Sequence, residues 1–152
     1  MYLKYSKVRN VKSPNRAHVG QDAGLDFFIP NDFAENYELK PGENVLIPSG
    51  IKVEVPVGYC FILYNKSGVA AKKCLLVGAC VVDSGYSGEV HIDMHNVSNE
   101  SVYLNPGDKI IQGILLPIVV PTVIEVPEDN LYQDILSLSD RGAGGFGSTN
   151  KS

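Results

Sequence analysis

The sequence predicts an all-β protein: a jelly-roll-like β-barrel with one short helix and a flexible C-terminal arm. Nine prolines and 15 glycines are spread along the 152 residues and separate short apolar runs. Many short strands with turn signals between them are typical of barrels and sandwiches. Before the C-terminal region only one segment has a helical pattern, and the chain then ends in a glycine-rich stretch. We therefore expect a β-barrel over residues 1–128 and an arm over residues 129–152.

Composition and charge narrow the class of protein. Hydrophobic residues make up 44% and charged residues 20% of the chain, as in an ordinary globular domain. The net charge of -4 argues against a general binder of nucleic acid or anionic membranes. The three cysteines lack the close spacing of a zinc site and are odd in number, which indicates a reducing compartment. The charged N-terminus is unlike a signal peptide, and no apolar run approaches the roughly 20 residues of a membrane span. We expect a soluble, cytoplasmic protein.

The expected elements follow in order along the chain. Residues 2–8 alternate loosely and predict a first strand, whereas the polar residues 9–21 predict a loop. Apolar or alternating runs predict further strands at residues 25–29, 45–47, 51–55, 59–64, 101–104, 109–117 and 119–126. The short helix is expected at residues 67–73, with Ser67 able to cap its start and lysines at its end. Another short helix is expected within residues 128–139, with Leu131, Ile135 and Leu136 as its apolar positions.

The central segment, residues 77–90, predicts a β-hairpin that carries chemistry. An apolar strand ends at Val82, a glycine-containing turn follows, and alternation resumes at Val90. Asp83 then lies at the strand end, partly open to solvent, and Tyr86 is close enough to form a pocket wall over a backbone floor. An acid, a flat aromatic ring and backbone amides can bind a planar base and activate a water against it. The simpler interpretation is that Asp83 only starts a turn, which aspartate commonly does.

The C-terminal stretch, RGAGGFGST at residues 141–149, has four glycines among nine residues. Ordering so many glycines in a core strand has a large entropic cost, so we expect an arm that orders when a ligand binds. Its arginine, phenylalanine and serine suit a phosphorylated aromatic ligand. The alternative is a terminal tail without a role.

Five segments together resemble a known family. They are AGLD at residues 23–26, KSGVA at residues 66–70, the central segment, GDKIIQ at residues 107–112, and the glycine-rich stretch. Their order and spacing resemble the five motifs of the trimeric dUTPases, with VVDSGYSGE and RGAGGFGST as the most specific parts. The resemblance implies a homotrimer with active sites shared between subunits. It also implies hydrolysis of dUTP to dUMP and pyrophosphate by water attack on the α-phosphorus, which limits uracil in DNA and supplies dUMP for dTMP synthesis.

The resemblance also implies roles for individual residues. Asp83 would activate the water, and Tyr86 would pack on the deoxyribose and exclude a 2′-hydroxyl. Asp26 would lie near the metal, a Mg²⁺ ion held mainly by substrate phosphates and water without a direct protein ligand. The other expected substrate-binding residues are Lys66, Ser67, Gly68, Gly78, Ala79, Cys80, Val82, Gln112, Arg141, Phe146, Gly147 and Ser148.

Three positions depart from the family pattern. Lys66 stands where the family usually has arginine, so the charge is kept but the planar guanidinium is lost. Cys80 replaces a common glycine and could narrow the base slot. Ser87 replaces a frequent arginine and removes a basic contact. These departures put affinity and rate in question more than the reaction type.

Two other functions and one other metal site compete with this interpretation. A dCTP deaminase shares the fold, and its catalytic glutamate would fall at Asp93, but deaminases lack the glycine-rich tail. A dUTPase-fold module that binds proteins is the other alternative. Glu89, His91, Asp93 and His95 alternate on one strand face and could ligate zinc; a polar face without metal is the simpler expectation.

Overall fold

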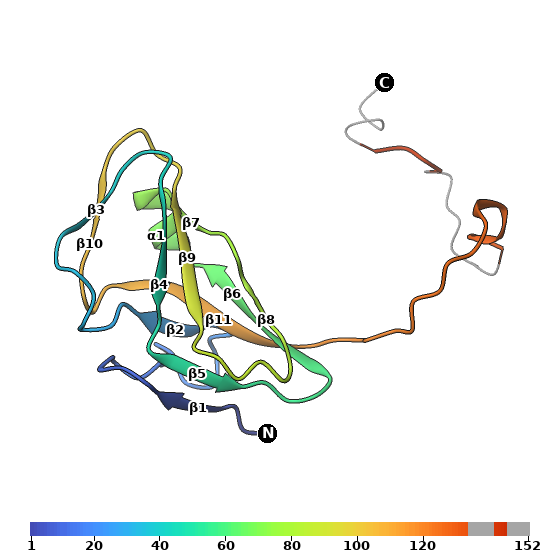
Figure 1. Ribbon diagram of the computed structural model, residues 1–152, viewed down its shortest axis with the longest axis horizontal. Helices are drawn as coiled ribbons and strands as arrows, with labels where there is room; N and C mark the ends of the chain where they lie inside the picture. The colour runs from blue at the N-terminus through green and yellow to red at the C-terminus, as the bar shows by residue number, and fades with distance from the viewer. Residues whose placement is uncertain (134–141, 146–152) are drawn as a thin grey trace. The chain divides into compact units, whose positions relative to one another are not determined.

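The computed structural model describes residues 1–133 and 142–145 of the chain. Residues Met1–Val119 form one compact unit, and Val120–Ser152 belong to a second. The compact unit has eleven strands and one helix (Figure 1), which confirms the all-β class. In chain order these are β1 (Lys4–Lys7), β2 (Leu25–Phe28), β3 (Tyr37–Leu39), β4 (Asn44–Pro48), β5 (Ile51–Glu54), β6 (Tyr59–Asn65), α1 (Ser67–Lys73), β7 (Leu75–Val77), β8 (Val81–Val82), β9 (His91–Asn96), β10 (Val102–Leu104) and β11 (Lys109–Pro117).

The strands form four antiparallel sheets. Their orders are β2-β11-β6-β8, β4-β9-β7, β1-β5 and β10-β3, and among the described residues they do not join into one closed ring. The two larger sheets share a single hydrophobic core. Phe27 of β2 and Phe61 of β6 pack there with ring centroids 5.9 Å apart, beside the fully buried Ile92 and Met94 of β9.

The predicted hairpin at residues 77–90 is wrong. β8 pairs with β6, with Val82 opposite Phe61, whereas β9 pairs with β4 and β7. The eight residues between β8 and β9 therefore carry the chain from one sheet to the other. Val90 is bound at this crossing, because it donates to Ile51 O (2.8 Å) and accepts from Ser49 N–H (3.0 Å).

Other differences concern short elements. The structure adds β3 and β7, which were not predicted, and residues 119–126 form no strand. Ser67 does not cap α1, since Lys66 holds the N-cap position without a side-chain cap hydrogen bond, while Lys72 and Lys73 do lie in the last turn. In the described part of residues 128–139 there is only a 3₁₀ turn, Glu128–Asn130; Ile135 and Leu136 lie outside the described residues.

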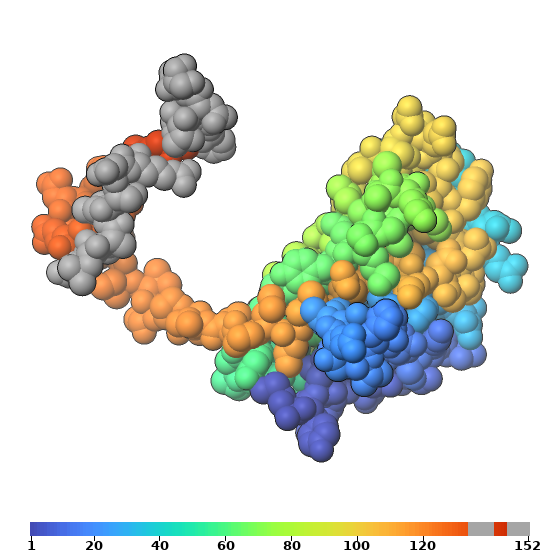
Figure 2. Space-filling view, turned by 180° about the vertical axis from the view of Figure 1, so that it is seen from behind, coloured from blue at the N-terminus to red at the C-terminus, as the bar shows by residue number. Residues whose placement is uncertain are grey.

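The segment that precedes β2 lies against the sheet near Asp26. Viewed from behind (Figure 2), the blue segment that precedes β2 lies beside the orange of β11, and Asn15 is bridged to Asp26 of β2. No helix in the described part of the chain is long and apolar enough to cross a membrane.

Candidate active site

A pocket of about 250 Å³ opens where β8 ends and β9 begins. Leu63 of β6 and Val90 contribute apolar surface, and His91 lies at its side. Five of the residues expected from the sequence to form the site line this pocket: Ala79, Cys80, Val82, Asp83 and Tyr86. The structure thus brings an acid, an aromatic ring and a stretch of backbone together around one hollow.

A tight turn after β8 aims Asp83 and Tyr86 at the same pocket. Tyr86 N–H donates to Asp83 O (3.2 Å), and Gly85 between them has a φ of 87°. That left-handed conformation favours glycine over residues with a side chain. Asp83 itself is exposed, so its carboxylate is open to water while it faces the pocket. Such a group can accept a proton from a water held beside it.

The ring of Tyr86 is fixed at its outer end. Its hydroxyl donates to Glu89 O (2.9 Å). A Cβ added at Gly88 would lie 2.3 Å from the same hydroxyl, so only glycine leaves room for the ring there. The face of Tyr86 can therefore act as a pocket wall of fixed orientation.

Asp93 supports the backbone that leads into the pocket. Gly78 N–H donates to Asp93 O (2.8 Å), and Ala79 N–H donates to Asp93 Oδ2 (3.1 Å). Burial opposes ionisation of Asp93, but hydrogen bonds from Ala79 and Asn44 outweigh it and lower the pKa of this carboxyl. Asp93 does not line the pocket; its carboxylate holds the backbone in place.

A second cluster, which we call the lysine cluster, consists of Asp26, Lys66 and Lys109. Asp26 is only 4% exposed, and its carboxylate pairs with the amines of Lys66 and Lys109, the latter at 3.0 Å. Two cations against one anion leave a net positive charge. Lys109 was not predicted as a site residue, although it lies within the GDKIIQ motif. β11 brings it beside β2, because Lys109 pairs with Phe28.

Gln112 lies opposite Asp26 in the pairing of β11 with β2 and is bound to Asn65 of β6. Gln112 Nε2 donates to Asn65 O (3.0 Å), and Asn65 Oδ1 accepts from Val77 N–H (2.7 Å), next to Gly78. Asn65 lies two residues beyond Leu63 in β6, a rise of about 7 Å along a strand. These bonds hold Gln112 beside Asp26 of the lysine cluster.

The remaining expected residues fall in two groups. Ser67 and Gly68 begin α1 and are exposed beside Lys66. The other group lies outside the described residues: Arg141, Phe146, Gly147 and Ser148.

The side chains considered for zinc, from Glu89 just before β9 to His95 within it, make contacts with other protein groups. Glu89 binds Arg9 and the backbone of Gly50, and His95 Nε2 lies 3.1 Å from Asp93 Oδ2. Within residues 1–133 and 142–145, no group of three or more His, Cys, Asp or Glu side chains is arranged to hold a metal ion.

A family model described as dUTPase matches residues 9–150. The chain belongs to the dUTPase family. The family predicted from the sequence is thereby confirmed. The relatives include the deoxyuridine 5′-triphosphate nucleotidohydrolase of Nautilia profundicola, 38% identical over 99% of this chain and 100% of the relative. The enzyme of the same name from Clostridium acetobutylicum is 39% identical, over 97% of this chain and 95% of the relative.

Solved structures of phage dUTPases share the fold. The dUTPase of Staphylococcus bacteriophage 80alpha, solved with dUPNHPP, has a TM-score of 0.75 at 27% identity, over 97% of each chain. A mutant dUTPase from phage phi11 of S. aureus has a TM-score of 0.74 at 27% identity, over 84% of this chain and 98% of that one. That structure is described as revealing the coordination of a structural Mg(II) ion. These likenesses support the jelly-roll-like architecture of the dUTPase family.

Proposed function

We propose that the protein hydrolyses dUTP to dUMP and pyrophosphate by attack of water on the α-phosphorus. One observation carries the proposal: a chain of the dUTPase family gathers Asp83, Tyr86 and the 79–82 backbone around one pocket. The lysine cluster supplies charge for a triphosphate. The reaction would limit uracil in DNA and supply dUMP for dTMP synthesis.

Each group contributes a separate part of the reaction. Asp83 accepts a proton from the attacking water, a role worth about 10²–10⁴-fold in rate. Tyr86 packs on the deoxyribose and leaves little room for a 2′-hydroxyl. The backbone at residues 78–82 faces the uracil edge, and a close fit there disfavours the methyl group of thymine. Lys66 and Gln112 contact the phosphate chain, with Ser67 and Gly68 at the start of α1 beside them.

The described residues fit a Mg²⁺ ion that arrives with the nucleotide. Both carboxylate oxygens of Asp26 are already paired with lysines, so Asp26 lies near the phosphates without being free to ligate the ion directly. Mg²⁺ commonly keeps several waters and binds through substrate phosphates. Bound in this way, it would neutralise charge on the phosphate oxygens.

The assembly we propose is a homotrimer with shared sites. The segment at residues 119–126 supports it, because Val119, Val123 and Ile124 are 88%, 89% and 76% exposed in the single chain. Apolar side chains so exposed in one segment indicate a surface that another chain covers. The arm, residues 129–152 after a barrel of residues 1–128, would carry Arg141, Phe146, Gly147 and Ser148 to a neighbour's pocket.

Mixed trimers test the shared site. Asp83→Asn in an intact chain and a chain that ends at Ser139 should each be inactive. If they are unfolded together in equal amounts and refolded, subunits mix at random. A site then works when its pocket comes from the truncated chain and its arm from the substituted one, so about a quarter of sites should regain activity. Mixed trimers without activity would refute the shared site.

Two structural points favour hydrolysis over the alternatives. Asp93, the position of the deaminase glutamate, does not line the pocket, and its carboxylate is bound to the backbone of Ala79. A protein-binding module would have no need of the Asp83–Tyr86 arrangement. The three cysteines are free, which supports a reducing, cytoplasmic location.

The deciding assay is product analysis with dUTP, dCTP and UTP in the presence of Mg²⁺. Pyrophosphate release from dUTP, abolished by Asp83→Asn, is the expected result. Ammonia release from dCTP would instead show a deaminase. The absence of both products would indicate a binding module.

A further inference from the structure

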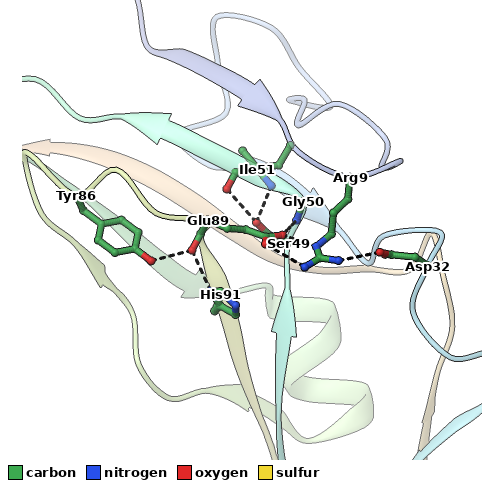
Figure 3. Close-up of polar contacts among 8 residues, drawn as sticks. All are labelled: Arg9, Asp32, Ser49, Gly50, Ile51, Tyr86, Glu89 and His91. Carbon is green, nitrogen blue, oxygen red and sulfur yellow. Dashed lines mark hydrogen bonds and ion pairs between the residues drawn. The ribbon is translucent and has the colours of Figure 1, made fainter.

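A polar network joins Tyr86 to the loop that follows β1 (Figure 3). Arg9 Nε donates to Glu89 Oε1 (2.7 Å) and Nη2 to Glu89 Oε2 (3.2 Å), so the guanidinium grips both carboxylate oxygens. Its third nitrogen, Nη1, donates to Asp32 Oδ2 (2.8 Å). Bidentate pairs of this kind fix geometry as well as adding energy.

Glu89 is held from a second side as well. Gly50 N–H donates to Glu89 Oε1 (2.7 Å), and the Glu89 side chain is only 14% exposed. Burial opposes ionisation of Glu89, but the hydrogen bonds from Arg9 and Gly50 outweigh it and lower the pKa of the carboxyl. At neutral pH Glu89 is therefore charged and anchored at its side chain.

The backbone carbonyl of this anchored residue holds the pocket wall. Glu89 O accepts the Tyr86 hydroxyl (2.9 Å), and His91 Nδ1 lies 2.9 Å from the same oxygen. Figure 3 shows the Tyr86 hydroxyl and the His91 ring both directed at this carbonyl. The side chain of Glu89 thus fixes the acceptor that orients Tyr86.

The ring needs such an anchor because space lies on both of its sides. Besides lining the pocket of about 250 Å³, Tyr86 lines a wider groove of about 830 Å³ with Tyr5, Val55 and Ser84. Tyr86 is 48% exposed, so packing alone does not confine it. Without the hydroxyl contact the ring is free to swing toward the groove and open the sugar side of the pocket.

We propose that Glu89, gripped by Arg9, is a positioning residue that holds Tyr86 against the sugar and so sets the preference for deoxyribose over ribose. The inference rests on the proposed function for the identity of the nucleotide. It assigns a selectivity role to Arg9, which lies 77 positions before Tyr86 and lines neither the pocket nor the groove.

Sugar preference and base preference, measured side by side, test this role. Glu89→Gln and Arg9→Lys should each lower the ratio of dUTP to UTP in kcat/KM by about five- to tenfold, the worth of one hydrogen bond. The ratio of dUTP to dCTP should stay within twofold of the parent, because the base contacts are untouched. Arg9→Lys keeps the positive charge but cannot bind both carboxylate oxygens of Glu89. Because the charge is kept, we expect this variant to fold, so that a changed sugar ratio reports the lost contact.

Two control variants break other contacts of the same kind. Asp32→Asn removes the charge of the residue that pairs with Arg9 Nη1 and leaves the pair with Glu89. Glu54→Gln breaks the exposed Lys4–Glu54 ion pair (3.1 Å). Both should keep the parental sugar ratio. In a Tyr86→Phe background, which has no hydroxyl to hold, Arg9→Lys should change the sugar ratio by less than twofold.

The outcomes are distinct. An unchanged sugar ratio in Glu89→Gln and Arg9→Lys, equal losses in sugar and base ratios, or an undiminished effect of Arg9→Lys in the Tyr86→Phe background would each overturn the positioning role. Calorimetric affinities for dUMP and UMP report the same sugar preference without turnover. If the parent does not hydrolyse dUTP, the proposed function is refuted. The calorimetric comparison of dUMP with UMP still tests the role of Glu89 in that case.

Discussion

Gly24→Ala tests whether Gln112 is held in place for the phosphates. A Cβ added at Gly24 would lie 1.9 Å from Gln112 Oε1 and 2.7 Å from Cδ. The side chain must move, since its flexible end yields more easily than backbone. The move breaks the bond from Gln112 Nε2 to Asn65 O, 3.0 Å long in the parent.

The expected loss is that of one hydrogen bond, about 1 kcal/mol or roughly fivefold in an equilibrium constant. We expect the KM for dUTP to rise about fivefold and the free energy of unfolding, from urea titration, to fall by about 1 kcal/mol. In a Gln112→Ala background the side chain to be displaced is gone, so Gly24→Ala should then change KM by less than twofold. A KM within twofold of the parent for Gly24→Ala alone would refute the phosphate role of a positioned Gln112.

Three further predictions follow from the site. Asp83→Asn should keep nucleotide affinity, measured by calorimetry, and lower kcat by about 10²–10⁴-fold, because an amide cannot take the proton; kcat within a few-fold of the parent would remove Asp83 from the mechanism. Lys66→Arg should tighten dUTP more than dUMP, because a guanidinium can bind Asp26 and a phosphate at once; equal effects on both ligands would contradict a phosphate contact. Asp93 has a lowered pKa, so its stabilisation is present above the ordinary value of 3.8 and is lost as pH falls further. Urea titrations of the parent and of Asp93→Asn should therefore converge below about pH 3.8, and a constant difference from pH 6 to 3 would contradict the shift.

Local patterns predicted which side chains face the core. Val90, Ile92 and Met94 alternate in the sequence and are all buried, because successive side chains of a strand point to opposite faces whatever the strand pairs with. The helix at residues 67–73 also forms with the predicted bounds, although none of its residues is buried. The grouping of Asp83 and Tyr86 was also predictable, since three residues of a turn keep them close without help from the rest of the chain.

Local sequence patterns predict the strand class, the helix and the short motifs, whereas the strand pairings and ion pairs depend on the tertiary structure. Val82 pairs with Phe61 instead of closing a hairpin, because burial against β6 outweighs the local turn signal. The pairs of Asp26 with Lys109 and of Glu89 with Arg9 join residues 83 and 80 positions apart. No periodicity encodes such contacts, since they arise only when sheets fold together and buried carboxylates must find cations.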